Sequence, residues 1–331
     1  RGTLRGGTAT LRTEATAGDI ALEQPVNGEQ AWTLAWGAGS ITLTGVGGGT
    51  TPLGLVTVNL AANVTTSAAF SSAGFNQSTS GTGTTQIGGL LTSTAAVTLN
   101  AATVDLNFGI TTTAGGSAGK VTLNASSLVD LVTGVNIATE ASQAANDTTI
   151  SGAVDINVTG TGTVNLVGEI VTTGDVNTAA AGAAGGAVTI DTNNGAVTIS
   201  DITTSGGAST NTDTNGGVAG AITITTGNSN VITLATSTLT AVGGAKQGSG
   251  TQGAGATINF DDPVALAAGT ATITTGATAG DITFDQTVNG AQALTLTSGA
   301  GSITFTGVGG GTTPLGLVTV NLVAKDRKSV V

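Results

Sequence analysis

Short bursts of alternating apolar and polar residues recur along residues 119–255. Each burst opens with a glycine, and the five opening glycines are 33, 34, 34 and 35 residues apart. In the third burst Val188 and Ile190 are apolar, whereas Thr189 and Asp191 are polar. Alternation with a period of two predicts a half-buried strand, and a fixed period of this length is typical of units that stack on one another. The bursts begin at Gly119, Gly152, Gly186, Gly220 and Gly255.

Two more apolar runs follow within each period. A second run contains Val164, Val197 and Ile232 in successive periods, and a third contains Ile137, Ile170, Ile202 and Leu239. A tract of small polar residues and glycine then follows, as at residues 206–217 and 243–253, and such tracts are typical of loops. We therefore predict an all-β fold, a parallel β-solenoid with about three short strands per coil.

Such a solenoid accounts for the residue types at each position. Strands of successive coils pair about 4.8 Å apart, so inward Val, Ile and Leu stack into aliphatic ladders and outward Thr into hydroxyl ladders. Glycine suits the corners, where a positive φ is often needed. No coil buries its apolar side alone, so stability comes from its neighbours. Low aromatic content, 2%, agrees with a narrow layered interior rather than a compact globular core.

A longer repeat encloses the coil period. Residues 8–62 recur at 270–324, offset by 262 residues, and 42 of the 55 aligned positions are identical. We predict one solenoid array over residues 1–324, with regular coils of about 34 residues over 119–254, as a fragment of a larger repetitive protein. Residues 325–331 are basic and break the pattern. They resemble a translated sequencing adapter, which indicates a non-native tail from metagenomic DNA; a natural basic tail is the alternative.

Two parts of the chain carry weaker patterns. Residues 63–95 are rich in Ser, Thr, Gly and Ala, so we expect a loose coil or a protruding loop there. Trp32 and Trp36 become Leu294 and Ser298 in the second copy of the long repeat. The first exchange predicts an inward position for Trp32, and the second predicts a surface position for Trp36.

Charge restricts the classes of partner. The formal net charge is −11, and Lys120 and Lys246 are the only bases between Thr13 and Ala324. Binding of nucleic acid or anionic lipid needs clustered Lys and Arg, so neither is expected. The chain has no Cys, and Gly, Thr, Ser and Asn interrupt every apolar run, so we predict neither disulfides nor a membrane span.

The candidates for chemistry are few. The chain has no His and no Cys, which disfavours zinc, iron and nucleophilic triads. Asp261 with Asp262, and the group Asn211, Asp213 and Asn215, offer oxygen atoms for calcium, but turn residues bonding their own backbone are the favoured interpretation. We predict no metal, cofactor or catalytic residue.

Asp155 and Asp191 carry the main alternative. They occupy similar places in successive coils, which would suit a carbohydrate-active β-helix enzyme, either a hydrolase or a lyase. An Asn/Asp ladder is the simpler interpretation, because arginines and aromatic sugar platforms are missing nearby.

Pairs of the form Thr-x-Thr suggest a further alternative, an ice-binding or self-assembling matrix protein. A regular hydroxyl grid on one flat face would resemble that of ice-binding solenoids. Thr is also the favoured outward residue of any strand, which is the simpler interpretation. The pairs are Thr42/Thr44, Thr223/Thr225, Thr272/Thr274, Thr295/Thr297 and Thr304/Thr306.

Residues 280–290 (GDITFDQTVNG) and 301–307 (GSITFTG) resemble the strand repeats of very large bacterial surface proteins, the filamentous-haemagglutinin-like and autotransporter-like adhesins. The resemblance implies a right-handed β-helix, export to the cell surface or the extracellular space, and a role as stalk or adhesin without catalysis. It covers nearly the whole chain but carries no family-defining catalytic residue.

Loops after the third strand, near residues 175–184, 206–217 and 243–253, are expected to form one decorated edge. If a host-surface, glycan or matrix ligand binds, we expect it on this edge, because loops vary without disturbing the rod. Unpaired strand edges at the two ends also predict end-to-end self-association.

Overall fold

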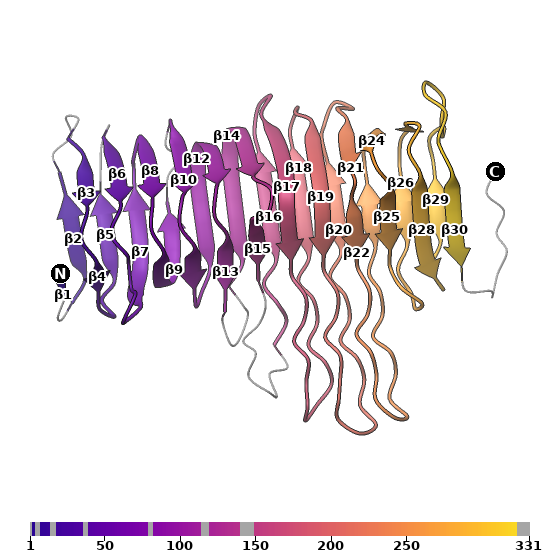
Figure 1. The fold of residues 1–331 in the computed structure, drawn as a ribbon, viewed down its shortest axis with the longest axis horizontal. Coiled ribbons are helices and arrows are strands. Elements are labelled where there is room, and N and C mark those ends of the chain that lie inside the picture. Colours follow the sequence, from indigo (N-terminus) through magenta and orange to yellow (C-terminus); the bar gives the residue numbers. More distant parts are fainter. Residues whose placement is uncertain are drawn as a thin grey trace.

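The computed structural model describes residues 2–3, 7–13, 18–35, 39–78, 82–113, 119–139 and 149–322. Over these ranges the chain forms 30 short strands and no helix. Each pairing between these strands is parallel. Figure 1 shows the strands side by side along a rod, with β1 and β30 at opposite ends of that rod. The prediction of an all-β, solenoid-like stack is confirmed.

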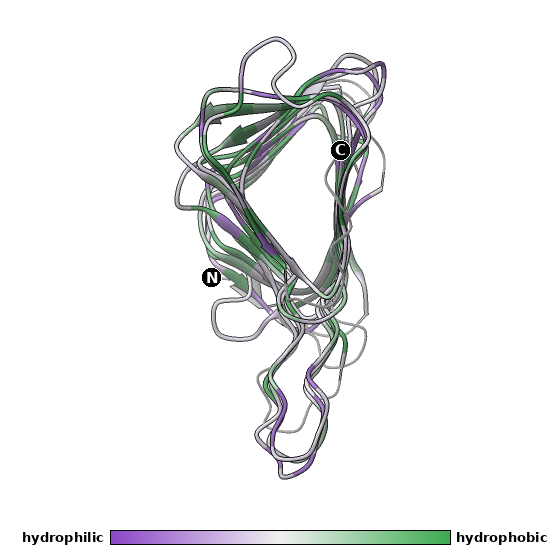
Figure 2. Ribbon diagram, turned by 90° about the vertical axis from the view of Figure 1, so that its right-hand side faces the viewer, coloured by the Kyte–Doolittle hydropathy of each residue, from purple (hydrophilic) through white to green (hydrophobic). Residues whose placement is uncertain are grey.

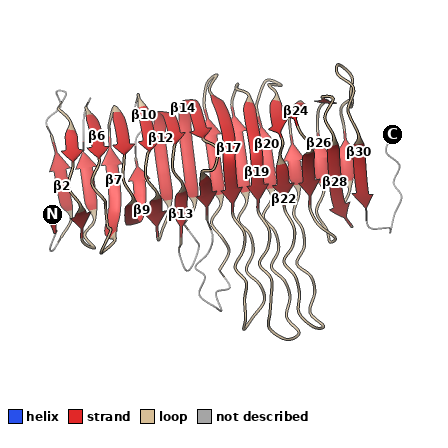
Figure 3. Cartoon of the chain, in the orientation of Figure 1, coloured by secondary structure: helices blue, strands red, loops and turns tan. Residues whose placement is uncertain are grey.

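Strand pairing divides the rod into three columns, which we call columns A, B and C. In each column a strand pairs with its counterpart one turn later, so neighbours in space are distant in sequence. Figure 2 looks along the rod, and the backbone there has a three-sided outline. Several strands are long enough to contribute to two columns, because the chain bends at a corner without leaving the strand; they include β9, β12, β14, β17 and β19 (Figure 3).

Column A contains β2 (Ala9–Arg12), β5 (Trp32–Ala35), β7 (Leu53–Asn59), β9 (Phe70–Gln77), β12 (Val97–Leu106), β14 (Val121–Leu131), β16 (Val154–Val158), β18 (Val188–Thr192), β20 (Ile222–Thr225), β23 (Ile258–Phe260), β26 (Ile282–Phe284) and β29 (Ile303–Phe305). Column B contains β3 (Ile20–Leu22), β6 (Ser40–Leu43), β8 (Asn63–Thr66), β10 (Thr84–Ile87), the ends of β12 and β14, β17 (Thr163–Val171), β19 (Val197–Thr203), β21 (Ile232–Ala235), β24 (Val264–Ala268) and β27 (Val288–Asn289). Column C contains β1 (Gly2–Thr3), β4 (Val26–Asn27), the start of β9, β11 (Leu91–Ser93), β13 (Ile110–Thr112), β15 (Asn136–Ala138), the ends of β17 and β19, β22 (Thr238–Thr240), β25 (Ala271–Thr274), β28 (Leu294–Gly299) and β30 (Val318–Leu322).

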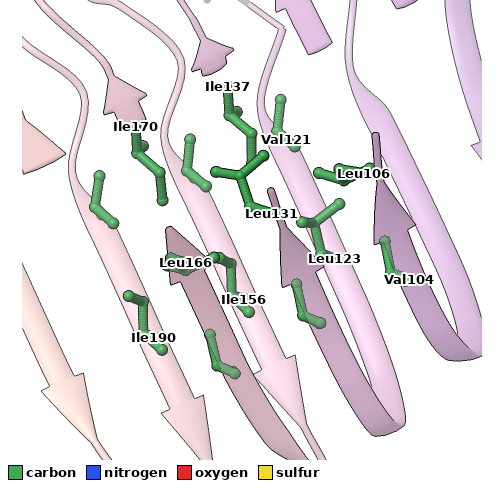
Figure 4. Packing of buried hydrophobic residues seen from close by; sticks show 14 of the residues in the cluster. Val104, Leu106, Val121, Leu123, Leu131, Ile137, Ile156, Leu166, Ile170 and Ile190 are labelled. Atoms are coloured by element: carbon green, nitrogen blue, oxygen red, sulfur yellow. The ribbon is translucent and has the colours of Figure 1, made fainter. Parts of the chain in front are cut away.

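The apolar ladders follow these columns, as the periodicity predicts. In column A the register joins Val154, Val188 and Ile222, and in column C it joins Ile137, Ile170 and Ile202. All of these side chains are fully buried. Figure 4 shows residues of this kind pointing into the interior from neighbouring turns. Because these ladders are mainly aliphatic and continue from turn to turn, the core is a thin layer that runs along the rod.

Aromatic side chains join the core near the C-terminal end of the rod. The rings of Phe260, Phe284 and Phe305 occupy one register position in column A. Their centroids lie 4.9 and 4.8 Å apart, with interplanar angles of 2° and 9°. The stacking distance equals the spacing of paired strands, so the sheet itself sets the ring geometry.

The expectation of a loose coil or loop over residues 63–95 is wrong. Strands β8 to β11 continue the three columns through the described part of this region, and Phe70 and Phe75 are buried with their rings 5.8 Å apart. Several inward positions here carry polar side chains. The alternation of apolar and polar residues that marks a half-buried strand is therefore missing from the sequence. Thr85, for example, is buried, and its Oγ1 donates to Gln77 Oε1 at 2.8 Å.

Trp32 is buried, as its exchange for Leu294 predicts, and Leu294 is buried in turn. Trp36 and residues 325–331 lie outside the described residues. No helix among the described residues is long and apolar enough to span a bilayer.

Candidate functional site

Within residues 149–322, which the structure describes without a gap, three long connections lead from column C to column A on one edge of the rod. They span residues 173–185, 205–219 and 242–255, and together we call them the fin. Figure 1 shows the fin hanging below the rod, and Figure 2 shows its loops overlaid in the end view. The prediction that the loops after the third strand gather on one edge is confirmed.

A buried threonine closes the base of the first two fin loops. Thr172 Oγ1 donates to the Gly186 carbonyl at 2.5 Å, and Thr204 Oγ1 donates to the Gly220 carbonyl at 2.6 Å. The same bond closes a much shorter connection, where Thr275 Oγ1 donates to the Gly280 carbonyl at 2.7 Å. Since the closure is unchanged while the enclosed length differs, the rod does not depend on what lies beyond this bond.

The loops themselves are ordered by hydrogen bonds between successive turns. On the limb that returns to the rod, the amides of Gly182 and Gly185 donate to the carbonyls of Asn215 and Val218 at 3.0 and 2.9 Å. One turn later, Gly216 and Ala219 donate to Thr251 and Ala254 at 3.0 and 2.9 Å. Bonds at every third residue indicate an extended helix with three residues per turn, the polyproline II conformation, whose backbone groups bond to neighbours rather than to one another.

The outgoing and returning limbs of each loop also bond to each other. The amides of Gly217 and Gly220 donate to the carbonyls of Gly207 and Thr204, both at 2.8 Å, again at a spacing of three residues. A diagonal bond of 2.8 Å joins Gly207 to the Ala183 carbonyl of the preceding loop. The fin is therefore a two-layer bundle of extended chains held by backbone bonds in several directions.

Glycine makes this packing feasible because the layers touch backbone to backbone. A Cβ atom on Gly207 would lie 1.8 Å from the Asp175 carbonyl oxygen, and one on Gly217 would lie 1.9 Å from the Ala183 carbonyl oxygen. Neither residue has a positive φ. Close approach, rather than backbone conformation, thus requires glycine at these two positions.

The side chains of the fin lie on its flanks. Val176 and Val218 are about half exposed, at 54% and 50%, and the other flank positions are mostly Ala, Ser and Thr. Three residues of the fin, all within the described ranges, are charged. Asp175 is buried, whereas Asp213 and Lys246 lie near the tip. The flanks are consequently flat and uncharged.

Polar residues at the tip tie one loop to the next. Asp213 Oδ1 accepts from the Ser249 amide at 2.7 Å, Asn215 Oδ1 accepts from the Thr251 amide at 2.7 Å, and Asn211 Nδ2 donates to the Ala179 carbonyl at 2.8 Å. We expected these side chains to bond their own turns, and the structure instead directs them to neighbouring loops. The side-chain oxygens of Asp213 and Asn215 therefore accept bonds that hold successive loops together.

Asp213 makes the tip sensitive to pH. Hydrogen bonds from Ser249, first from its backbone amide and then from its hydroxyl, hold the pKa of Asp213 below its ordinary value. A lowered folded-state pKa stabilises the tip above the ordinary pKa of aspartate, about 4, and this contribution is lost as the pH falls through the folded-state value. We expect the Ser249 amide resonance in NMR spectra to move in that acidic range. The Asp213→Asn variant should show no such titration, and an unchanged titration would contradict the assignment.

The hydroxyl at the base of the fin has a measurable effect on stability. Replacing Thr204 by valine keeps the shape but leaves the buried Gly220 carbonyl without this donor, so we expect a loss of about 1–2 kcal/mol in the free energy of unfolding. Ser205→Ala, one residue further on and half-buried, serves as the control and should change stability by less than about 0.5 kcal/mol. Equal effects of the two variants in denaturant titrations would show that the bond contributes nothing.

Asp261 and Asp262, the other oxygen-rich candidate, are also engaged in bonds between turns. Asp262 is buried, and its Oδ2 accepts from the Thr226 and Gly227 amides at 2.7 and 3.2 Å. Asp261 Oδ2 accepts from Thr225 Oγ1 at 2.6 Å. Among the described residues, no group of three or more acidic, His or Cys side chains is arranged to hold a metal ion.

Asp155 and Asp191 are not opposite each other. The register pairs Asp155 with Thr189, and Asp191 with Asn157, so the two carboxylates are offset by two residues along the strand. Asp155 forms an ion pair with Lys120. The similar placement inferred from the sequence is therefore corrected by the register, since Asp155 is the third residue after its opening glycine and Asp191 the fifth.

Asp191 ends a ladder of asparagines. Asn157 Nδ2 donates to Asn124 Oδ1 at 2.9 Å, and Asn124 Nδ2 donates to Asn100 Oδ1 at 2.7 Å. This is the Asn/Asp ladder that the simpler interpretation predicts.

Sequence reasoning missed one carboxylate pair. Asp105 and Asp130 are direct neighbours in column B. Gln86 Nε2 donates to Asp105 Oδ2 at 2.8 Å, and Asn165 Nδ2 donates to Asp130 Oδ1 at 2.6 Å, so amides flank the pair on both sides. The pattern Val-Asp-Leu occurs in both strands, but one extra residue precedes it in β14, so equal spacing within the strands does not align the two aspartates.

The Thr-x-Thr pairs are distributed over the three faces. Thr223/Thr225 and Thr304/Thr306 belong to column A, Thr42 lies in column B, and Thr272/Thr274 lies in column C beside Thr295/Thr297. They do not form one continuous hydroxyl grid.

Comparison with known proteins identified no relative of this chain. No family model, curated protein or solved structure matches the chain. Because it stands away from the rod, the fin is the candidate functional site of this chain.

Proposed function

We propose that this chain is a structural and adhesive stalk module of a secreted or cell-surface bacterial repeat protein, without catalysis. We further infer that its solenoid-like stack is a right-handed β-helix with three strands per coil. The observation that carries the proposal is the unbroken register of column A, which links Ala9 to Ile303 through consecutive parallel pairings.

Such a register favours a mechanical role. Every turn is bonded to the turns on both sides by backbone hydrogen bonds in three columns, and no turn buries its apolar face alone. Bending the rod would break these bonds on one side, so the stack is stiff. A stiff rod with a narrow filled interior holds a surface at a distance from its point of attachment.

The fin supports the adhesive part of the proposal. It stands away from the rod, it is closed at its base by the hydroxyls of Thr172 and Thr204, and its flanks are flat and uncharged. We infer that a host-surface, glycan or matrix ligand contacts the fin. The enzyme alternative has less support, because the register separates Asp155 from Asp191 and gives Asp155 a lysine partner.

A variant without the fin tests this proposal. Residues 173–185, 205–219 and 242–255 would each be replaced by Gly-Ala-Thr-Ala, the four residues that connect Thr275 to Gly280 in the native chain. The intact chain and the variant would carry the same fluorophore and be applied to glycan arrays, matrix proteins and host cells. We expect the intact chain to bind at least one of these surfaces, and the variant to bind it at least tenfold more weakly.

Circular dichroism provides the control, because the variant should keep the β-sheet spectrum of the intact chain. Equal binding by the two proteins would show that the ligand does not contact the fin. Absence of binding by the intact chain would contradict the adhesive role while leaving the rod unaffected.

A further inference from the structure

The two copies of the long repeat lie on different faces of the rod. Ala9 begins a strand of column A, whereas its equivalent Ala271 begins a strand of column C. Ile20 lies in column B and its equivalent Ile282 in column A. Each strand of the second copy has therefore moved to another column, although the two sequences are nearly the same.

The number of turns between the copies explains the shift. Nine pairings along column A lead from Ala9 to Ile258, and the chain then passes through β24 in column B before it reaches Ala271 in column C. The 262-residue repeat thus contains nine full turns and two further faces. Because this is not a whole number of turns, the same residues cannot return to the same side.

Local structure is nevertheless the same in both copies. Asn27 Oδ1 accepts from the Thr50 amide at 2.8 Å, and Asn289 Oδ1 accepts from the Thr312 amide at 2.9 Å. The loops after these asparagines also agree, since Gly48 and its equivalent Gly310 have φ values of 66° and 70°. One surface is therefore built twice from the same contacts.

The orientation of that surface differs between the copies. The loop at residues 48–52 follows Gly47, which bridges to Val26 and Phe70 in column C. The equivalent loop at residues 310–314 follows Gly309, which bridges to Val288 in column B. The two identical loops consequently leave the rod from different faces.

We infer that the long repeat is out of phase with the rod, so that the second copy presents its surface on a different face, two columns further along the chain direction than the first. The two copies are about 46 Å apart along the axis, at about 4.8 Å per turn. A flat partner lying along one side reaches only one of the two loops. The repeat therefore suits independent partners that approach from different sides. This consequence for adhesion rests on the proposed function, whereas the placement of the two copies on different faces does not.

Two cysteine variants test the phase, because the native chain has no Cys. Thr50→Cys and Thr312→Cys replace exposed side chains at equivalent positions, and a double variant would be labelled with biotin-maleimide and streptavidin. Electron cryomicroscopy of the labelled rod, with the fin as landmark, should show the two labels on different faces. Labels on one face would overturn the inference.

A matched pair provides the control. Thr10 and Thr304 are exposed and occupy one register position of column A, so labels on Thr10→Cys and Thr304→Cys should leave the rod on the same side. If this pair also diverges, the rod twists too strongly for faces to be assigned and the inference fails. The outcome is independent of the binding assays, so failure of the adhesive role and failure of the phase are distinguishable.

Discussion

Replacing Ile224 by aspartate should lower the free energy of unfolding by about 4 kcal/mol or more. Ile224 is fully buried in column A, where its register partners are Ile190 and Phe260. A carboxylate at this position would meet only apolar neighbours on both sides, and it would interrupt a ladder through which adjacent turns stabilise each other. Denaturant titration followed by circular dichroism measures the effect.

The neighbouring residue gives a matched control. Thr223 points away from the core and is half-buried between Thr189 and Asn259, so Thr223→Asp should change stability by less than about 1 kcal/mol. Burial raises the pKa of a carboxyl group, so the loss in Ile224→Asp should also shrink as the pH falls and the group is protonated. Similar losses for the two variants would contradict the inward and outward assignment.

Replacing Gly207 by alanine should disrupt the fin while leaving the rod intact. The added methyl carbon would lie 1.8 Å from the Asp175 carbonyl oxygen and 2.5 Å from its carbonyl carbon, and these are backbone atoms that cannot rotate away. The layers must separate, which breaks the bonds from the Gly217 amide to Gly207 and from the Gly207 amide to Ala183. We expect amide hydrogen exchange in residues 173–185 and 205–219 to accelerate by about 100-fold or more, because loss of about 2.7 kcal/mol of local stability corresponds to that factor.

Ala208→Ser is the control for this variant. It adds one atom at the next position, which is half-buried on the flank, and should leave exchange in the fin unchanged. Exchange in the strands of columns A and B should remain slow in both variants. Rapid exchange of the fin in the native chain would show that its backbone bonds do not persist in solution, and would refute the two-layer bundle.

Alternation made the strands of the regular coils predictable. Val188 and Ile190 point inward and Thr189 outward because a strand turns successive side chains to opposite faces, and this geometry needs no knowledge of the partner strand. The same rule failed over residues 63–95, where Ser72, Thr85 and Ser93 take inward positions. Hydropathy cannot distinguish a buried hydroxyl that bonds inside the core from an exposed one.

The sequence predicted that the fin loops share one edge of the rod, but not how their backbones pack. Glycine, alanine and serine offer nothing large to bury, so residues 206–217 read as a loose loop. In the structure Gly206, Gly207, Gly216 and Gly217 are buried by other backbone. Gly206 and Gly207 follow Ile202 by four and five residues, and Gly243 and Gly244 follow Leu239 at the same spacing, so this repeated glycine pair was the available signal.

Local sequence by itself determined the strand positions, the inward and outward sides and the period of the coils, because these follow from the geometry of a single extended chain and the cost of exposing Val, Ile and Leu. Tertiary structure alone decided which carboxylates are neighbours, how the glycine tracts pack and which face each copy of the long repeat occupies. Those outcomes depend on residues that lie a full turn away, 19–37 positions along the chain. A difference of one strand in the count between copies moves a surface to another side of the rod without changing any residue within it.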